Sequence, residues 1–142
     1  MALHRRALLT SLASILASSK ALHSQELVSA LLDPSHARLE SGPVGEHRVY
    51  FEGSTEGLKS LVVGSLVLKP GQEPHPPHTH VDEEVIVLVE GTGEIGLNGK
   101  SSGVGPGEVM YAAPNCLHGI RNSGSTPLTL YYFKWIAKRS FA

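Results

Sequence analysis

The sequence predicts an all-β domain, built as a sandwich or a closed barrel, with one short helix ahead of it. All 15 glycines lie between Gly42 and Gly124, which marks a turn-rich region. Within that region, short runs of β-forming residues alternate with turn residues at regular intervals. At 142 residues, with 41% hydrophobic and 18% charged side chains, the chain suits one core and is too apolar to be disordered.

Residues 1–23 have the character of a targeting segment. Arg5 and Arg6 form a basic start, the 13 residues from Ala7 to Ser19 are uncharged, and no acidic residue precedes Glu26. The run is too short and too rich in Ser for a membrane span, which needs about 20 apolar residues. We expect a secretory signal, or a twin-arginine signal, that exports the protein to the periplasm or the medium. The alternatives are an organellar presequence and a plain surface helix on a cytoplasmic protein.

Residues 24–44 are expected to form the short helix and a connection to the β domain. Ser24 is a suitable N-cap. Within Gln25–Leu32, one helical stripe is apolar and consists of Leu27, Val28, Leu31 and Leu32. Pro34 would end this helix, because proline lacks the backbone N–H that a helix interior needs.

The β domain covers residues 45–142, and strands are predicted in it at residues 46–52, 60–69, 78–81, 84–90, 93–98, 100–104, 108–112, 117–121 and 127–135. Gly91-Thr92-Gly93 and Asn98-Gly99 are the expected hairpin turns, the second of the type that requires positive φ. The strand from Val85 to Val89 is apolar on both faces. Its outer face therefore needs a cover, either the N-terminal helix or a second subunit, and we expect a homodimer.

Charge and cysteine content exclude several functions. The net charge is −1, and without residues 1–23 nine basic residues stand against 13 acidic ones, which is unsuitable for holding nucleic acid. Cys116 is the single cysteine, so this chain can form neither an internal disulfide nor a four-cysteine zinc site. Eight histidines leave imidazole and carboxylate as the available metal ligands.

The segment from Pro74 to Glu84 is the richest in chemically active side chains. His78, His80 and Glu84 all have even numbers, so on an extended chain they project from one face. Two imidazoles at that spacing can reach one ion, and the carboxylate adds a third ligand. The alternative is a solvated polar loop. His75 precedes two prolines, so strand parity does not give its direction, and we expect a surface or supporting histidine.

A second segment, residues 107–122, contains His118. This histidine alternates in phase with Ile120 and therefore faces the core. Taken alone, a histidine on an apolar strand is more often a satisfied core group than a ligand. His36 and His47 have no partner that the sequence reveals, and Tyr132 has the opposite strand parity to Tyr131.

Together the two segments resemble the two motifs of the cupins, over roughly residues 45–135. The matching positions are Gly71, His78, His80, Glu84 and Gly91 for the first motif, and Gly107, Pro114, His118 and Asn122 for the second. Fifteen residues separate Gly91 from Gly107, as in compact single-domain members. Compared with the family pattern, one residue is added before His78 and one is missing before His118, which changes loops and no ligand type.

The resemblance implies a small single-domain, metal-binding cupin, that is, an antiparallel jelly-roll β-barrel. It also implies a divalent metal held inside the barrel by His78, His80, Glu84 and His118. Three imidazoles and one carboxylate leave one or two positions open on six-coordinate Mn, Fe, Ni or Co, and Zn is a further candidate.

We therefore expect a metal-dependent enzyme of the dioxygenase, decarboxylase, isomerase or lyase type that acts on a small oxygen-rich molecule. Glu84 would be its catalytic residue and would move a proton while remaining a ligand. Arg48 is preferred over Arg121 as a further cavity residue, and Ile86, Leu88, Met110 and Ile120 are the expected apolar lining. The alternative is a non-catalytic cupin that binds a sugar or a carboxylate, because a fold does not fix a function.

Overall fold

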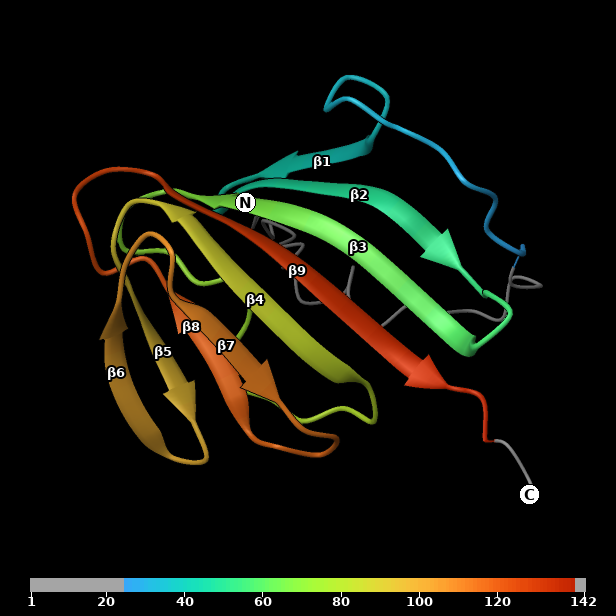
Figure 1. The fold of residues 1–142 in the computed structure, drawn as a ribbon. Coiled ribbons are helices and arrows are strands. Elements are labelled where there is room, and N and C mark those ends of the chain that lie inside the picture. Colours follow the sequence, from blue (N-terminus) through green and yellow to red (C-terminus); the bar gives the residue numbers. More distant parts are fainter. Residues whose placement is uncertain (1–24, 140–142) are drawn as a thin grey trace, which may run out of the picture.

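The computed structural model describes residues 25–139, and these residues are all-β (Figure 1). The strands are β1 (Arg38–Gly42), β2 (Gly45–Gly53), β3 (Leu58–Leu68), β4 (Glu83–Glu90), β5 (Gly93–Leu97), β6 (Lys100–Val104), β7 (Val109–Ala112), β8 (His118–Arg121) and β9 (Leu128–Ala137). Within this part of the chain, no helix has the length and apolarity needed to cross a membrane.

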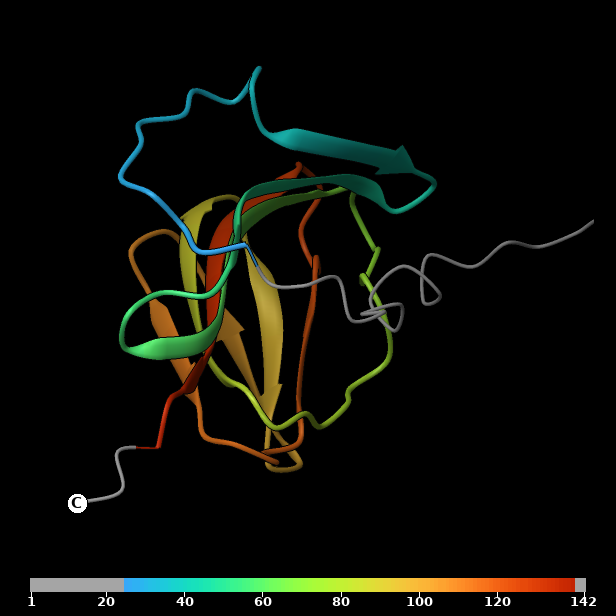
Figure 2. The ribbon, with the colours of Figure 1, turned by 90° about the vertical axis from the view of Figure 1, so that its right-hand side faces the viewer.

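The strands form two antiparallel sheets that face each other, which confirms the jelly-roll prediction. The larger sheet has the order β1-β2-β3-β9-β4-β7, and the smaller one has the order β6-β5-β8. Figure 1 shows the smaller sheet beneath the β4 and β7 side of the larger one, and Figure 2 shows the yellow-green β3–β4 connection running down one side. That connection carries two of the predicted ligands.

The core lies between the sheets and is built by strand alternation. On β4 and β9 every second side chain points inward, so that Leu88, Leu128 and Leu130 are almost fully buried. Each such leucine contributes about 1.5–3 kcal/mol by leaving water. Asn122 is also fully buried, and its Nδ2 donates to the Leu68 and Thr126 carbonyls, so its role is structural.

The predicted strands are largely confirmed, and so is the tight turn between β5 and β6. Asn98 has φ 51° and Gly99 has φ 79°, as a turn of that type requires. Strand β1 was not predicted, because Arg38–Gly42 contains few β-forming residues. This strand exists through its pairing with β2, where Leu39 lies opposite Arg48.

The strand predicted at 78–81 is wrong. The segment is a loop, and its one ladder contact is the bridge between His78 and His118. Pro76 and Pro77 come directly before it, and a proline has no N–H to offer to a neighbouring strand. The ligands of this loop are therefore positioned by a single bridge and not by a continuous strand.

The short helix predicted over Gln25–Leu32 is also wrong, because these residues have no regular secondary structure apart from one bridge residue. Glu26 forms a parallel bridge with Ser54, and the Leu27 N–H donates to the Ser54 carbonyl over 2.8 Å. Pairing with the end of β2 has thus replaced helix formation, and Leu31 is left 98% exposed. The proposed N-cap Ser24 and the whole targeting segment 1–23 lie outside the described residues.

The outer face of β4 consequently has no helix over it within residues 25–139. Its neighbours on this face are also apolar, since Val87 lies opposite Val109 on β7 and Tyr131 on β9. Val109 is 62% exposed and Tyr111 is 52% exposed. The helix is excluded as the cover of this face, and a second subunit remains the prediction.

Candidate metal centre

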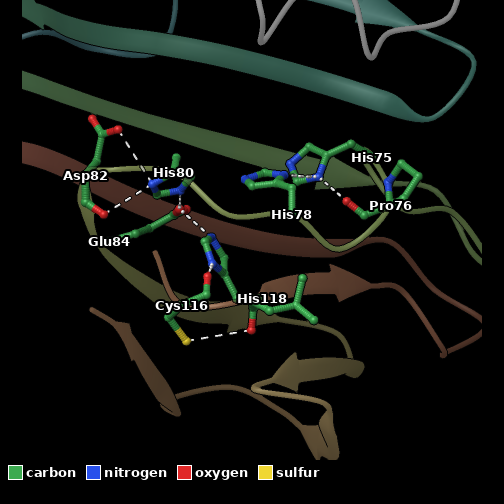
Figure 3. A network of polar contacts seen from close by, with 9 residues as sticks. His75, Pro76, His78, His80, Asp82, Glu84, Cys116 and His118 are labelled. Atoms are coloured by element: carbon green, nitrogen blue, oxygen red, sulfur yellow. Dashed lines mark hydrogen bonds and ion pairs between the residues drawn. The ribbon is translucent and has the colours of Figure 1, made fainter. Parts of the chain in front are cut away.

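Three imidazoles from different parts of the chain converge between the sheets (Figure 3). His78 and His80 come from the β3–β4 connection, and His118 begins β8. Their ring centroids lie 4.8–5.2 Å apart, and one ligand atom from each lies within 4.8 Å of the others. Of the residues described, these three form the group that could hold a metal ion.

Backbone hydrogen bonds fix the loop that carries His78 and His80. The His78 N–H donates to the His118 carbonyl over 2.9 Å, and the His118 N–H donates back to the His78 carbonyl over 3.0 Å. Further along, the Asn115 N–H donates to the His80 carbonyl over 2.7 Å. The loop is therefore attached to β8 at His78 and to the β7–β8 connection at His80.

Glu84 supplies a buried carboxylate to the same point, on the inner face of β4. Its Oε2 lies 2.8 Å from Nε2 of His80 and 3.0 Å from Nε2 of His118. Burial by itself would raise the pKa of Glu84, but the contacts with His118 and His80 outweigh it and lower the pKa to about 2. The carboxylate is thus held ionised.

In His80 and His118, the contact made by Nδ1 determines the protonation state of Nε2, the nitrogen that faces Glu84. His118 Nδ1 donates to the Cys116 carbonyl over 2.9 Å, and His80 Nδ1 lies 3.2 Å from the Asp82 carbonyl and 3.5 Å from its carboxylate. In a neutral imidazole with Nδ1 protonated, Nε2 carries a lone pair. Both Nε2 atoms then face the negative oxygen of Glu84.

Lone pairs facing a carboxylate need positive charge between them, either protons on both rings or a metal ion. The contact with Glu84 raises the pKa of His118, although burial alone would lower it. A raised pKa means that, without a metal, a proton on His118 supplies the positive charge. In metal-binding imidazoles, the ring nitrogen that does not bind the metal usually donates a hydrogen bond to an acceptor, as Nδ1 can in His80 and His118. The donor set therefore fits a divalent transition metal.

His75, whose direction the sequence left open, lies against His78. Its Nδ1 is 2.7 Å from Nδ1 of His78 and 2.9 Å from the Pro76 carbonyl. Burial, followed by the charges of His75 and His118, lowers the pKa of His78 to about 4, and burial lowers the pKa of His75. Both rings are therefore neutral near pH 7, which is the protonation state that binds metals.

A small cavity of about 40 Å³ adjoins the cluster, enough space for about three water molecules. Its lining includes the three groups His78, Glu84 and His118, together with Tyr132. The apolar part of the wall is formed by Leu66, Ile86, Ile120 and Leu130. Ile86 and Ile120 line it as predicted, whereas Leu88 and Met110 belong to the surrounding core.

A larger hollow of about 340 Å³ lies on the outer face of the smaller sheet. The paired glycines Gly96 and Gly119 are in its lining, and both have the opposite strand parity to the buried Ile95 and Ile120. The ligand-bearing side of β8 faces the other way. His118 and Ile120 are also among its lining residues, so the hollow borders the strand that carries this candidate ligand.

Neither arginine considered from the sequence reaches the cavity. Arg48 lies in one row with Ser65, Tyr131 and Val87 on the outer face of the larger sheet, where it pairs with Glu46 over 2.7 Å. The bulge after Val49 does not turn it inward. Arg121 is exposed, as expected.

The sequence reasoning missed a polar chain behind the cavity wall. The Tyr132 hydroxyl donates to Nε2 of His47 over 2.6 Å, and Nδ1 of His47 lies 3.7 Å from Oε2 of Glu40. The parity of Tyr132 with the buried Leu128 and Leu130 was the available signal. The contact between Tyr132 and His47 depends on the register across β2, β3 and β9, and Glu40 was hidden because β1 was not predicted.

Comparison with known proteins identifies the domain type. The family described as "Cupin domain" matches residues 64–134. No curated protein sequence is similar enough to this chain to count as a match.

Solved structures show the same fold at low sequence identity. An RmlC-like cupin from Shewanella frigidimarina has a TM-score of 0.63 at 17% identity, covering 81% of this chain and 97% of its own. KdgF from Halomonas sp. has a TM-score of 0.62 at 17% identity, covering 80% and 97%. A predicted oxalate decarboxylase from Thermotoga maritima has a TM-score of 0.61 at 19% identity, covering 75% and 99%.

Proposed function

Because the chain belongs to the cupin family, we propose that it binds one divalent transition metal through His78, His80, Glu84 and His118. The observation that carries the proposal is the position of Glu84 Oε2 between two Nε2 atoms, at 2.8 and 3.0 Å, whose outer nitrogens have acceptors. The residue types suit Mn, Fe, Ni, Co or Zn, and geometry alone does not select among them.

The proposed activity is that of a metal-dependent enzyme acting on a small oxygen-rich molecule, of the dioxygenase, decarboxylase, isomerase or lyase type. When bound, the metal would supply a Lewis-acid or redox centre. Ile86, Ile120 and Leu130 make part of the cavity wall apolar, and an apolar wall strengthens electrostatic interactions inside the cavity. The volume of about 40 Å³ favours substrates with few heavy atoms.

Glu84 is the proposed catalytic residue as well as a ligand, since its carboxylate lies at the cavity wall. Its pKa of about 2 makes it a weak base while both imidazoles contact it. Proton transfer to Glu84 therefore requires that one of these contacts is replaced.

The test is the metal content of the purified protein and of the variant His80→Ala. We expect about one metal ion per wild-type chain and none in the variant, because one of the four ligands is lost. The matched control is His36→Ala, since His36 is exposed and contacts Asp33 away from the centre. Full occupancy in His80→Ala would refute the ligand set, and the metal found directs the substrate screen.

A non-catalytic cupin that captures a small carboxylate or sugar is the second candidate. Its non-catalytic character is favoured by the cavity lining, which among the residues described contains Glu84 as its one carboxylate and no lysine or arginine that could act on a substrate. Ligand binding without turnover by the metal-loaded protein would select this candidate.

Two further parts of the proposal concern assembly and location. A homodimer is supported by the exposed apolar side chains Val109 and Tyr111, which a second subunit would cover. Export rests on residues 1–23, which lie outside the described part of the chain. N-terminal sequencing of the native protein tests it, and a start at Met1 would contradict it.

A further inference from the structure

Three side chains from three strands form a polar chain that leads away from the cavity. Tyr132 on β9 lines the cavity beside Glu84 and is only 6% exposed. Its hydroxyl donates to Nε2 of His47 on β2 over 2.6 Å, and the other ring nitrogen of His47 lies 3.7 Å from Oε2 of Glu40 on β1. The order is hydroxyl, imidazole and carboxylate, and Tyr132, which carries the hydroxyl, is the member of the chain that lines the cavity.

A glycine makes this arrangement possible. Gly64 on β3 lies between β2 and β9, opposite Tyr132 in one ladder and Val49 in the other. A Cβ built on Gly64 would lie 2.5 Å from the Tyr132 hydroxyl oxygen and 2.6 Å from the Arg48 carbonyl. The tyrosine ring therefore crosses β3 directly over Gly64 to reach His47, and a side chain at position 64 would obstruct it.

The protonation states along this chain are set by burial. Burial lowers the pKa of His47, against the charge of Glu40, and it raises the pKa of Tyr132. Near pH 7 the imidazole is therefore neutral and the phenol is protonated. The Glu40 carboxylate can only accept a proton, so the tautomer assigned to His47 carries its proton on Nδ1, facing Glu40, and Nε2 accepts from the Tyr132 hydroxyl.

Glu40 is ready to receive that proton in a hydrogen bond. Its Oε2 is buried and has no hydrogen-bond partner among the residues described. The other charged groups near His47 are Arg38, which also pairs with Glu52 over 3.0 Å, and Lys134 on β9. Nε of Arg38 lies 3.6 Å from Oε1 of Glu40, and protonation of His47 would bring a second positive partner to Oε2, which is how a carboxylate stabilises an imidazolium.

We propose that Tyr132, His47 and Glu40 form a relay that accepts the hydroxyl proton of a small ligand bound in the cavity. The ligand O–H bond breaks and its proton passes to the Tyr132 oxygen, while the proton of Tyr132 passes to Nε2 of His47. The ligand is left as an oxyanion, Tyr132 stays neutral, His47 becomes a cation beside Glu40, and no electrons are exchanged. Tyr132 is the catalytic residue, and His47 and Glu40 are positioning residues.

This relay would supply the proton acceptor that Glu84 provides poorly while its contacts hold its pKa at about 2. Its ligands are small hydroxyl compounds that a metal makes more acidic, so it rests on the proposed metal site for that acidification. The hydrogen bond between Tyr132 and His47, and the position of Glu40 beside His47, do not depend on that site.

The experiment counts the protons released when acetohydroxamic acid binds to the zinc-loaded protein. The probe is small, chelates metals and loses its hydroxyl proton when it does so. Calorimetry in two buffers of different ionisation enthalpy gives the proton count. In the wild type we expect about zero protons released and an affinity that varies little with pH near neutrality, because the proton stays on His47.

In Tyr132→Phe and His47→Gln the proton must leave for the solvent. We expect about one proton released per ligand, and an affinity that rises about tenfold per pH unit. His36→Gln is the matched histidine control and should behave as the wild type. A relay that merely supports the fold would leave the proton count equal in all four proteins.

Release of about one proton by the wild type, with binding intact, would overturn the relay while leaving the metal site standing. Failure of the wild type to hold zinc would instead refute the proposed metal site. The same titration on metal-free protein then decides the relay: binding with the proton retained supports it, and no binding or a released proton overturns it.

Discussion

Replacing Gly64 by alanine would test the crossing of Tyr132 over β3. The added Cβ would lie 2.5 Å from both Cζ and the hydroxyl oxygen of Tyr132, and 2.6 Å from the Arg48 carbonyl. One of these neighbours is a rigid ring and the other is backbone in a central ladder, so neither can move aside cheaply. Overpacking of this kind costs about 1–3 kcal/mol.

The displaced ring would also lose its hydrogen bond to His47, which adds about 0.5–1.5 kcal/mol. We therefore expect the free energy of unfolding to fall by about 2–4 kcal/mol, measured by urea denaturation. Gly57→Ala is the matched control, because a Cβ added to Gly57 would meet nothing within 4 Å and the φ of this residue is not positive. A loss of under about 0.5 kcal/mol in Gly64→Ala would show that the ring does not cross there.

Two other measurements follow from the structure. The free energy of unfolding of the metal-free protein should fall as the pH drops from 6.5 to about 4, because the unfolded chain then binds a proton at residue 78 that folded His78 does not. Urea denaturation across this range should show a smaller fall in His78→Gln than in the wild type. An equal fall in both proteins would exclude His78 as its source. Val109→Asp places a charge on the apolar outer face and should convert a dimer into monomers, as measured by analytical ultracentrifugation. The control Leu117→Asp, at an exposed site before β8, should leave the dimer intact. A monomeric wild-type protein would contradict the dimer.

Local patterns in the sequence were sufficient for the strands that alternate along the chain. Glu84 and Ile86 share the inner face of β4 as their parity indicates, and Tyr132 follows Leu130 on β9 in the same way. In contrast, β1 has little β-forming composition and exists because β2 lies beside it. Its pairing is a property of the fold, which no window of residues around Arg38–Gly42 contains.

The four candidate ligands lie together in the structure, although part of the reasoning that grouped them was wrong. His78 and His80 were grouped because they share a face of a strand, and the segment is not a strand. Their convergence with His118 comes from the reciprocal bridge at His78. The partnership of His47 with Tyr132 needed the register across β2, β3 and β9, together with the missing side chain at Gly64, and short-range periodicity reports neither.

The bridge between His78 and His118 has a thermodynamic consequence. It joins the β3–β4 loop of one sheet to the first residue of β8 in the other, so the four proposed ligands are assembled only while the two sheets remain docked. Metal affinity and sheet docking are then linked quantities, and each must strengthen the other by the same free energy. Substitutions in the core that are far from any proposed ligand would thus weaken metal binding, because they destabilise the packing between the two sheets.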